Sequence, residues 1–502
     1  MTEPLPEPAI HADLPGAEAR RVDPQMALMT TPLRSLLRHA PVMLPPTASI
    51  VSAAQLMREQ RVSSVLVVDG QRLVGIVTDR DLRSRVVAEA LPPHGPLADI
   101  ATPAPLCLPA QATGFDALLL MTRHNIHHLP VLETTPEGTR VAGMVSFSDL
   151  QVQQDNSAVF LAGEIFRQND VQGLVLTSTR IRNLQRHLAA ADATAYASGH
   201  VISAITDALT TRLLELATAR FGPPPLAYAW VAAGSQARGE QTARSDQDNC
   251  LVLDDAFDSD QHDSYFEPLA RFVCDGLDAC GYVHCPGDIM AMTDAWRQPL
   301  RRWTQYFENW IDRPEPKALL WSCVFFDQRA VYGDSTLLER LRTEVLQRAR
   351  GNALFLAHMA GNALSHEPPL GLFGGIKTAR GGEHQGTVDL KRFGIAPIVE
   401  LVRVYALAAG DAAVNTYDRL EGAAAGGEVS AGSARDLRGA LEFLAALRIR
   451  HQARQLEAGQ GADNFLVLDD LSQFERGQLK DAFAVVRMLQ QVLRQRYRGV
   501  LP

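Results

Sequence analysis

Short apolar runs and helical patterns alternate between residues 33 and 152, and one such unit is followed by a second copy. The spacing of apolar residues in each copy predicts the order helix, strand, turn, strand and helix, because helical spacing alternates with the every-second-residue spacing of strands. In the first copy we expect a helix over residues 53–59, strands over 65–68 and 73–77, and a further helix from Asp81. The matching positions are Leu44 and Leu108, Met57 and Met121, Val67 and Val131, and the segments Gly75–Leu82 and Gly143–Leu150.

Beyond the repeat, helical spacing of apolar residues returns over 158–167, 178–191 and 201–221. The apolar runs Tyr228–Ala233 and Cys250–Leu253 are typical of buried strands. The last 150 or so residues predict long amphipathic helices, and Ser472 with Glu475 predicts a capping box at the start of the last one. These C-terminal helices are expected over residues 337–351, 396–409, 434–456 and 471–497.

The pattern predicts an α/β plus α fold class, with an α+β repeat, a mixed sheet with helices and a C-terminal helical bundle. Because 502 residues exceed what one hydrophobic core usually supports, several domains are expected. The expected divisions are a flexible tail over 1–30, the repeat over 31–152, a helical connector over 153–221, a mixed-sheet domain over 222–345 and a helical domain over 346–502.

The strongest chemical signal lies between the two buried strands. Gly234 and Ser235 break the first strand into a turn that can open a short helix, where backbone N–H groups are suited to bind phosphate. Asp246 and Asp248 stand two residues apart at the head of the second strand, so their carboxylates are expected on one face. Paired carboxylates are hard oxygen ligands that suit Mg²⁺ together with substrate phosphates.

This constellation, with Arg238-Gly239-Glu240 after the Gly-Ser turn, resembles the DNA polymerase β-type nucleotidyltransferase superfamily. The Arg-Gly-Glu variant is most similar to the uridylyltransferases that modify PII signalling proteins. The resemblance implies that Gly234, Ser235 and Arg238 contact the triphosphate, and that Asp246 and Asp248 bind metal as catalytic residues. It also implies a third metal-binding and catalytic carboxylate. Asp327 ends the apolar run 319–326 and is followed by Arg329 and Val331 in strand-like alternation, so it is preferred over Asp288, which stands in a turn.

The repeat resembles a tandem pair of CBS domains. The resemblance implies that Thr78, Asp81, Ser146 and Asp149 bind a regulatory nucleotide, commonly an adenine nucleotide such as AMP or ATP. A carboxylate can accept two hydrogen bonds from a ribose diol. The same residues are also favoured helix caps, so a purely structural role stays open.

Composition limits the partners. The net charge of -9 argues against a sequence-independent grip on nucleic acid, which needs a basic face. No apolar run approaches the length of a membrane span, and the start of the chain lacks the order of a signal peptide, so a cytoplasmic location is expected. The six cysteines show no ligand or disulfide spacing and are expected to be reduced.

The order of repeat, transferase and helices resembles bacterial signal-transduction nucleotidyltransferases whose helical domain is thought to hold the acceptor. A glycine-rich segment from Gly371 to Lys377 could form a mobile basic loop, and Lys377 is a candidate nucleotide contact.

The expected function is therefore transfer of a nucleoside monophosphate from an NTP to a hydroxyl of a protein, PII-like by resemblance, with two Mg²⁺ ions. The enzyme would be uridylyltransferase- or adenylyltransferase-like and regulated by adenine nucleotide at the CBS pair, and a homodimer is expected by resemblance. The main alternative is a non-catalytic adenine-nucleotide sensor that serves as a docking protein. Transfer to a small molecule or to an RNA end is a third reading, of which the RNA version fits the acidic chain poorly.

Overall fold

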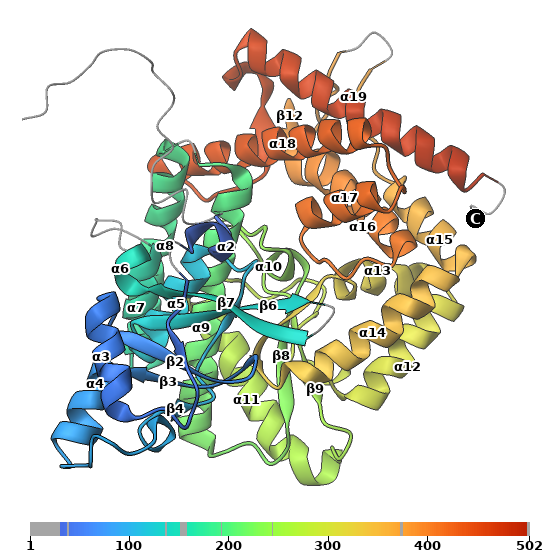
Figure 1. The fold of residues 1–502 in the computed structure, drawn as a ribbon. Helices are drawn as coiled ribbons and strands as arrows, with labels where there is room; N and C mark the ends of the chain where they lie inside the picture. Colours follow the sequence, from blue (N-terminus) through green and yellow to red (C-terminus); the bar gives the residue numbers. More distant parts are fainter. Residues whose placement is uncertain are drawn as a thin grey trace, which may run out of the picture.

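The computed structural model describes residues 31–37, 40–135, 138–150, 158–191, 193–242, 244–371 and 375–498. The tail expected over residues 1–30 and residues 372–374 of the glycine-rich loop lie outside these ranges. Figure 1 shows the repeat region, in blue to cyan, and the C-terminal helices, in orange to red, on different sides of the molecule. The expected α/β plus α fold class is confirmed.

The two repeats form matching α+β units. In each, a short strand pairs parallel with the first strand of a central antiparallel hairpin. The first unit contains β1 (Met43–Leu44), α3 (Ile50–Gln60), β2 (Ser64–Asp69), β3 (Arg72–Thr78), α4 (Asp79–Asp81), η1 (Leu82–Val87), η2 (Leu97–Asp99) and β4 (Thr102–Pro103), whereas α2 (Leu33–Leu36), which precedes them in the chain, packs in the core of the second unit. The second contains β5 (Leu108–Pro109), α5 (Gly114–His124), β6 (His128–Thr135), β7 (Gly138–Ser146) and α6 (Phe147–Leu150).

Three helices follow, and the four-stranded sheet that carries the carboxylate pair comes next. Its strand order is β10-β9-β8-β11, with β10 parallel to β9 and the other pairs antiparallel. Every residue of β8 and β9 is buried, because both strands have a neighbouring strand on each side and helices such as α12 and α14 pack against the sheet. The elements of this region are α7 (Ala158–Arg167), α8 (Val171–Ala190), α9 (Ala195–Phe221), β8 (Tyr228–Ala233), α10 (Gly234–Arg238), β9 (Asn249–Leu253), α11 (Ser259–Ala279), η3 (Asp294–Trp296), β10 (Arg297–Pro299), α12 (Leu300–Asp312), α13 (Pro316–Phe325), β11 (Gln328–Gly333) and α14 (Ser335–Gly351).

One element differs from its expectation. Asp327, expected to lie in a strand with Arg329 and Val331, stands just before β11, which begins at Gln328, and the apolar run over residues 319–326 that precedes it forms the end of α13 and its C-cap. An apolar run without a clear period does not separate a buried helix from a buried strand. Pro316 at the first turn favours the helix, since its missing N–H would be unpaired there in any case.

The C-terminal region is helical, and its long helix α18 packs against α8 and α9 as well as α19. The expected capping box is present, because the Ser472 hydroxyl accepts from the N–H of Glu475 and the Glu475 carboxylate accepts from the N–H of Ser472. The elements are α15 (Ala353–Ala363), β12 (Thr387–Asp389), η4 (Lys391–Ile395), α16 (Ala396–Ala409), α17 (Thr416–Ala425), α18 (Ala431–Glu457), β13 (Phe465–Val467), η5 (Leu468–Asp470) and α19 (Gln473–Arg496). Among the described residues, no helix combines the length and the apolarity that a membrane crossing needs.

Candidate functional site

The Gly-Ser turn connects β8 to the short helix α10, as the sequence predicts. Gly234 has φ +59°, and a Cβ atom there would lie 2.7 Å from Oδ2 of Asp248, so the position requires glycine on both counts. Its N–H donates to the main-chain carbonyl of Asp327 at 3.0 Å. This N–H is therefore used within the protein, which corrects the expectation that it is free for a phosphate.

A cavity of about 320 Å³ opens beside this turn, between the mixed sheet and the C-terminal helices. The predicted residues Gly234, Ser235, Arg238, Asp246 and Asp248 all line it. Asp246 and Asp248 precede β9 rather than lying within it, yet both reach the same cavity. The structure thus brings together the turn, the arginine and the carboxylate pair that the sequence singles out.

The carboxylate pair carries concentrated negative charge. Burial, and then the neighbouring charge of Asp246, raises the pKa of Asp248 to about 6. Nζ of Lys391 lies 4.0 Å from Oδ1 of Asp246. A divalent cation would relieve this repulsion, and two carboxylates that face a cavity match the few protein ligands that Mg²⁺ takes beside substrate phosphates. The described residues hold no cluster of three or more His, Cys, Asp or Glu side chains placed to bind a metal.

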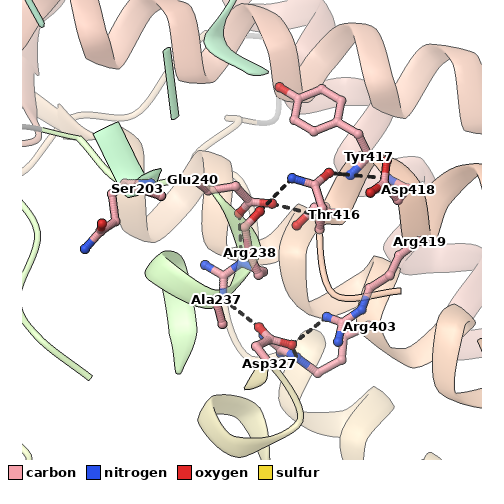
Figure 2. Close-up of polar contacts among 12 residues, drawn as sticks. Ser203, Ala237, Arg238, Glu240, Asp327, Arg403, Thr416, Tyr417, Asp418 and Arg419 are labelled. Carbon is pink, nitrogen blue, oxygen red and sulfur yellow. Dashed lines mark hydrogen bonds and ion pairs between the residues drawn. The ribbon is translucent and has the colours of Figure 1, made fainter. Parts of the chain in front are cut away.

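Asp327 does not join this pair as a free carboxylate. It is fully buried, and its two oxygens accept from Nη1 of Arg238 at 2.5 Å, from Nε and Nη2 of Arg403 at 3.0 and 2.6 Å, and from Nη1 of Arg419 at 2.5 Å. Figure 2 shows guanidinium groups converging on this carboxylate. These cations hold the pKa of Asp327 well below its usual range, despite the opposing effect of burial. Because both oxygens are saturated by guanidinium donors, this geometry gives Asp327 an anchoring role in place of the expected metal-binding one.

Arg238 is held from three sides. Besides Asp327, it donates from Nε to Glu240 at 2.8 Å, and its carbonyl accepts from the side-chain amide of Asn415 at 2.6 Å. Glu240 in turn accepts from the main-chain N–H of Thr416 at 3.0 Å. The Arg-Gly-Glu run therefore ties the mixed-sheet domain to the start of α17 (Figure 2), while Arg238 still lines the cavity.

Two other candidates lie elsewhere. Asp288 is exposed, has φ +54° in its turn and does not line the cavity. Lys377 is exposed and lines a separate depression of about 500 Å³ beside Arg392 and Phe465. The structure does not bring either residue to the carboxylate pair.

Three residues of the cavity wall went unrecognised in the sequence, all from the C-terminal region. Glu400 and Arg403 are the two charged residues of the otherwise apolar helix α16, three positions apart, and both line the cavity. That spacing places them on one helix face, a signal that the sequence does carry. Arg448 on α18 also lines the cavity, and burial lowers its pKa to about 10.

A second, larger cavity of about 690 Å³ lies between the two repeats. Thr78, Asp81 and Ser146 line it, and each repeat carries the same cap geometry beside it. The carboxylate of Asp81 accepts from the N–H and the hydroxyl of Thr78 at 2.9 and 2.7 Å, and that of Asp149 accepts from the same groups of Ser146 at 2.8 and 2.6 Å. The predicted helix caps are therefore present at the edge of a cavity large enough for a nucleotide.

Family models match all three regions of the chain. The CBS domain model matches residues 33–88 and 97–152. The model described as "Putative nucleotidyltransferase DUF294" matches residues 179–317, and the one described as "Putative nucleotidyltransferase substrate binding domain" matches residues 353–497. The two walls of the cavity thus fall in the two nucleotidyltransferase-associated models.

Curated relatives match smaller parts of the chain. The Meiotically up-regulated gene 70 protein of Schizosaccharomyces pombe is 42% identical over 93 residues, which are 18% of this chain and 13% of that protein. The Uncharacterized protein YlbB of Bacillus subtilis is 32% identical over 111 residues, which are 22% of this chain and 72% of that protein. The matches to the Schizosaccharomyces protein and to an Arabidopsis thaliana CBS domain-containing protein span only 13% and 16% of those relatives.

Among solved structures, a CBS domain protein from Pyrobaculum aerophilum complexed with AMP is 31% identical and covers 24% of this chain and 92% of that chain, with a TM-score of 0.23. A second one, described as "The structure of a putative signal-transduction protein with CBS domains from Burkholderia ambifaria MC40-6", is 25% identical and covers 26% of this chain and 98% of that chain, with a TM-score of 0.22. By the family models that match it, the chain combines a CBS domain pair with a nucleotidyltransferase domain of the DUF294 type and the substrate-binding domain that belongs to it.

Proposed function

We propose that this chain transfers a nucleoside monophosphate from an NTP to a hydroxyl group of a protein acceptor, with release of pyrophosphate. The observation that carries the proposal is the cavity in which Asp246 and Asp248 lie beside the Gly-Ser turn and face the helical domain. Nucleotidyl transfer needs bound divalent metal, a place for the triphosphate and an acceptor held in line with it. The cavity offers residues suited to each of these needs.

Asp246 and Asp248 would hold Mg²⁺, which supplies electrostatic stabilisation of phosphate charge when bound. Ser235 can donate its hydroxyl to a phosphate oxygen, and Arg238 and Arg448 bring positive charge to the same cavity. Lys391 extends this positive charge toward Asp246. Cations placed where negative charge develops on the leaving pyrophosphate stabilise the transition state.

Adenine nucleotide binding between the CBS repeats is the proposed control. The cavity there has the required size, and α5 of the second repeat packs against α7, which packs against α9. Arg123 of α5 also pairs with Glu215 of α9 at 2.9 Å. These contacts connect the CBS pair to the transferase domain. A ligand of the CBS pair could therefore change the conformation of the transferase domain, provided that it binds one of two conformations of the protein more tightly than the other.

The acceptor we would test first is a PII-like protein, since the run from Gly234 to Glu240 resembles that of PII uridylyltransferases. The test incubates the protein with α-labelled ATP, UTP, GTP or CTP, Mg²⁺ and either cell lysate or a purified PII protein. We expect label on a protein band with the wild type and none with Asp246→Ala/Asp248→Ala. Binding of AMP measured by calorimetry serves as the control, because it should be unchanged in the double variant. A double variant that labels as well as the wild type, or a wild type that labels nothing, would contradict the proposal.

A further inference from the structure

Helix α16 carries two charged residues into the wall of the transferase cavity. Its other residues from Ala396 to Ala409 are apolar apart from Tyr405, and most are buried against neighbouring helices. Glu400 and Arg403 are three positions apart and line the same cavity as Asp246 and Asp248. The helix therefore presents a carboxylate and a guanidinium to the cavity, where both groups can interact with a polar ligand.

One oxygen of the Glu400 carboxylate has no hydrogen-bond partner, whereas the carboxylates of Asp327 and Glu240 near the same cavity are occupied. The Oε2 atom of Glu400 is buried and accepts no hydrogen bond within the described part of the chain. Asp327 is saturated by three arginines, and Glu240 accepts from Arg238 and from the N–H of Thr416. A carboxylate oxygen that is buried without a hydrogen-bond donor destabilises the fold. Packing alone gives no reason for α16 to keep a glutamate at this position.

The charges that face Glu400 come from several elements. Burial raises the pKa of Glu400 to about 7, and the charge of Asp327 acts in the same direction. Arg403, on the same helix, and Arg238, on α10, act against this rise. The same cavity is lined by two further cations, Lys391 of η4 and Arg448 of α18, and by the carboxylates of Glu240, Asp246 and Asp248. Glu400 can therefore both accept and release a proton near neutral pH.

We propose that Glu400 is the general base that activates the acceptor hydroxyl. This assignment rests on the proposed nucleotidyl transfer. In the reaction, the carboxylate takes the proton of the acceptor O–H while that oxygen forms a bond to the α-phosphorus. The bond between the α-phosphorus and the bridging oxygen breaks, and pyrophosphate leaves with its electron pair. In this arrangement the nucleotide lies against the mixed-sheet domain and the acceptor lies against the C-terminal helices. Glu400 belongs to the C-terminal helices, which is the side on which a base for the acceptor hydroxyl is needed.

Arg403 supports this role as a positioning residue. Its Nε and Nη2 atoms are used by Asp327, while its Nη1 atom is buried without a partner among the described residues. That N–H can donate to the acceptor oxygen or to a phosphate oxygen once substrate fills the cavity. Because Asp327 fixes the guanidinium, the unpartnered Nη1 atom of Arg403 is held in place before substrate arrives.

The decisive variant is Glu400→Gln, which keeps the shape of the side chain and removes the base. We expect label transfer from α-labelled NTP to fall about 100-fold, in the usual range for loss of a general base, with the Kd for the NTP unchanged within about threefold. The acid limb of the wild-type pH–rate profile, with its midpoint near pH 7, should shift to lower pH in this variant, because the ionisation of Glu400 no longer contributes to it. Glu400→Asp should keep a part of the rate. Glu421→Gln is the matched control, since Glu421 is an exposed glutamate on the neighbouring helix α17 that pairs with Arg438.

A second readout does not depend on activity. Because the folded-state pKa of Glu400 lies above its ordinary value of 4.5, ionisation of this group weakens folding as the pH rises from about 4.5 through 7. Glu400→Gln should therefore have a higher Tm than the wild type at pH 8 and lose this advantage at pH 5, whereas Glu421→Gln should show no such change.

The outcomes separate the two proposals. If the wild type transfers label and Glu400→Gln does so equally well with the same pH profile, the assignment of Glu400 is wrong while the proposed function stands. If the wild type transfers no label to any acceptor, the proposed function fails, and the role of Glu400 as a base fails with it. A Tm difference that is the same at pH 5 and pH 8 also contradicts the assignment, because it means that Glu400 does not titrate in this range.

Discussion

The carboxylate of Asp327 accepts hydrogen bonds from three guanidinium groups that come from α10, α16 and α17. It follows α13 directly, so one buried acid links the mixed sheet to two helices of the C-terminal region. The sequence points to Asp327 as a special residue, but its type and position cannot distinguish a metal ligand from an anchor. That distinction depends on Arg403 and Arg419, which lie more than seventy positions further along the chain.

Asp327→Asn should destabilise the protein by about 3–5 kcal/mol, because it leaves three buried arginines without their counter-ion. The measurement is urea unfolding at pH 7. The difference should shrink below pH 4, since a carboxylate with a lowered folded-state pKa stabilises the protein above its unfolded pKa of about 3.9 and loses this contribution as the pH falls.

Asp334→Asn is the matched control for this measurement. Asp334 caps α14 through hydrogen bonds from Thr336, at the far end of the strand that follows Asp327, and it is partly exposed to solvent. Because asparagine caps a helix about as well as aspartate, this exchange should leave the free energy of unfolding nearly unchanged. If Asp327→Asn is no more harmful than Asp334→Asn, the anchoring role is refuted.

At the scale of elements, local patterns predict much of the secondary structure. The strand Tyr228–Ala233 and the helices Ala158–Arg167 and Ala396–Ala409 end where periodicity and turn residues say they should. The boundary between α13 and β11 is not predicted, because the run 319–326 holds one polar residue, Ser322, and so shows no clear period. Helices α15 and α17 were not expected, since both are short stretches rich in alanine between stronger patterns.

The cap at the start of α4 gives an element-scale prediction. Asp81→Ala should abolish or strongly weaken binding of AMP to the full chain, because Asp81 lines the cavity between the CBS repeats. Calorimetry with AMP measures the effect.

Asp116→Ala is a matched control for this change. Asp116 accepts from the N–H and the hydroxyl of Thr113, both at 2.8 Å, in the same capping geometry, but it does not line the cavity. Both variants should lose about 1 kcal/mol of stability from the cap. Equal AMP affinity in the two variants would show that the Asp81 cap is only structural.

At the scale of the whole molecule, the candidate site belongs to two domains. The sequence predicts the sheet-side half, because Gly234, Ser235, Arg238, Asp246 and Asp248 stand within fifteen positions of one another and form a local motif. It does not predict the helical half. Glu400 and Arg448 reach the cavity only through the packing of α16 and α18, which no local spacing describes.

The measurement that tests the central claim most directly follows the two ends of one labelled NTP. The wild type is incubated with Mg²⁺, acceptor and an NTP that carries different labels on its α- and γ-phosphates. Nucleotidyl transfer predicts that the α-label becomes attached to the acceptor while the γ-label leaves as pyrophosphate, and that Asp246→Ala/Asp248→Ala abolishes both. Release of the γ-label as inorganic phosphate, or its transfer to the acceptor, would contradict the account, because the bond broken would then not be the one beside the α-phosphorus.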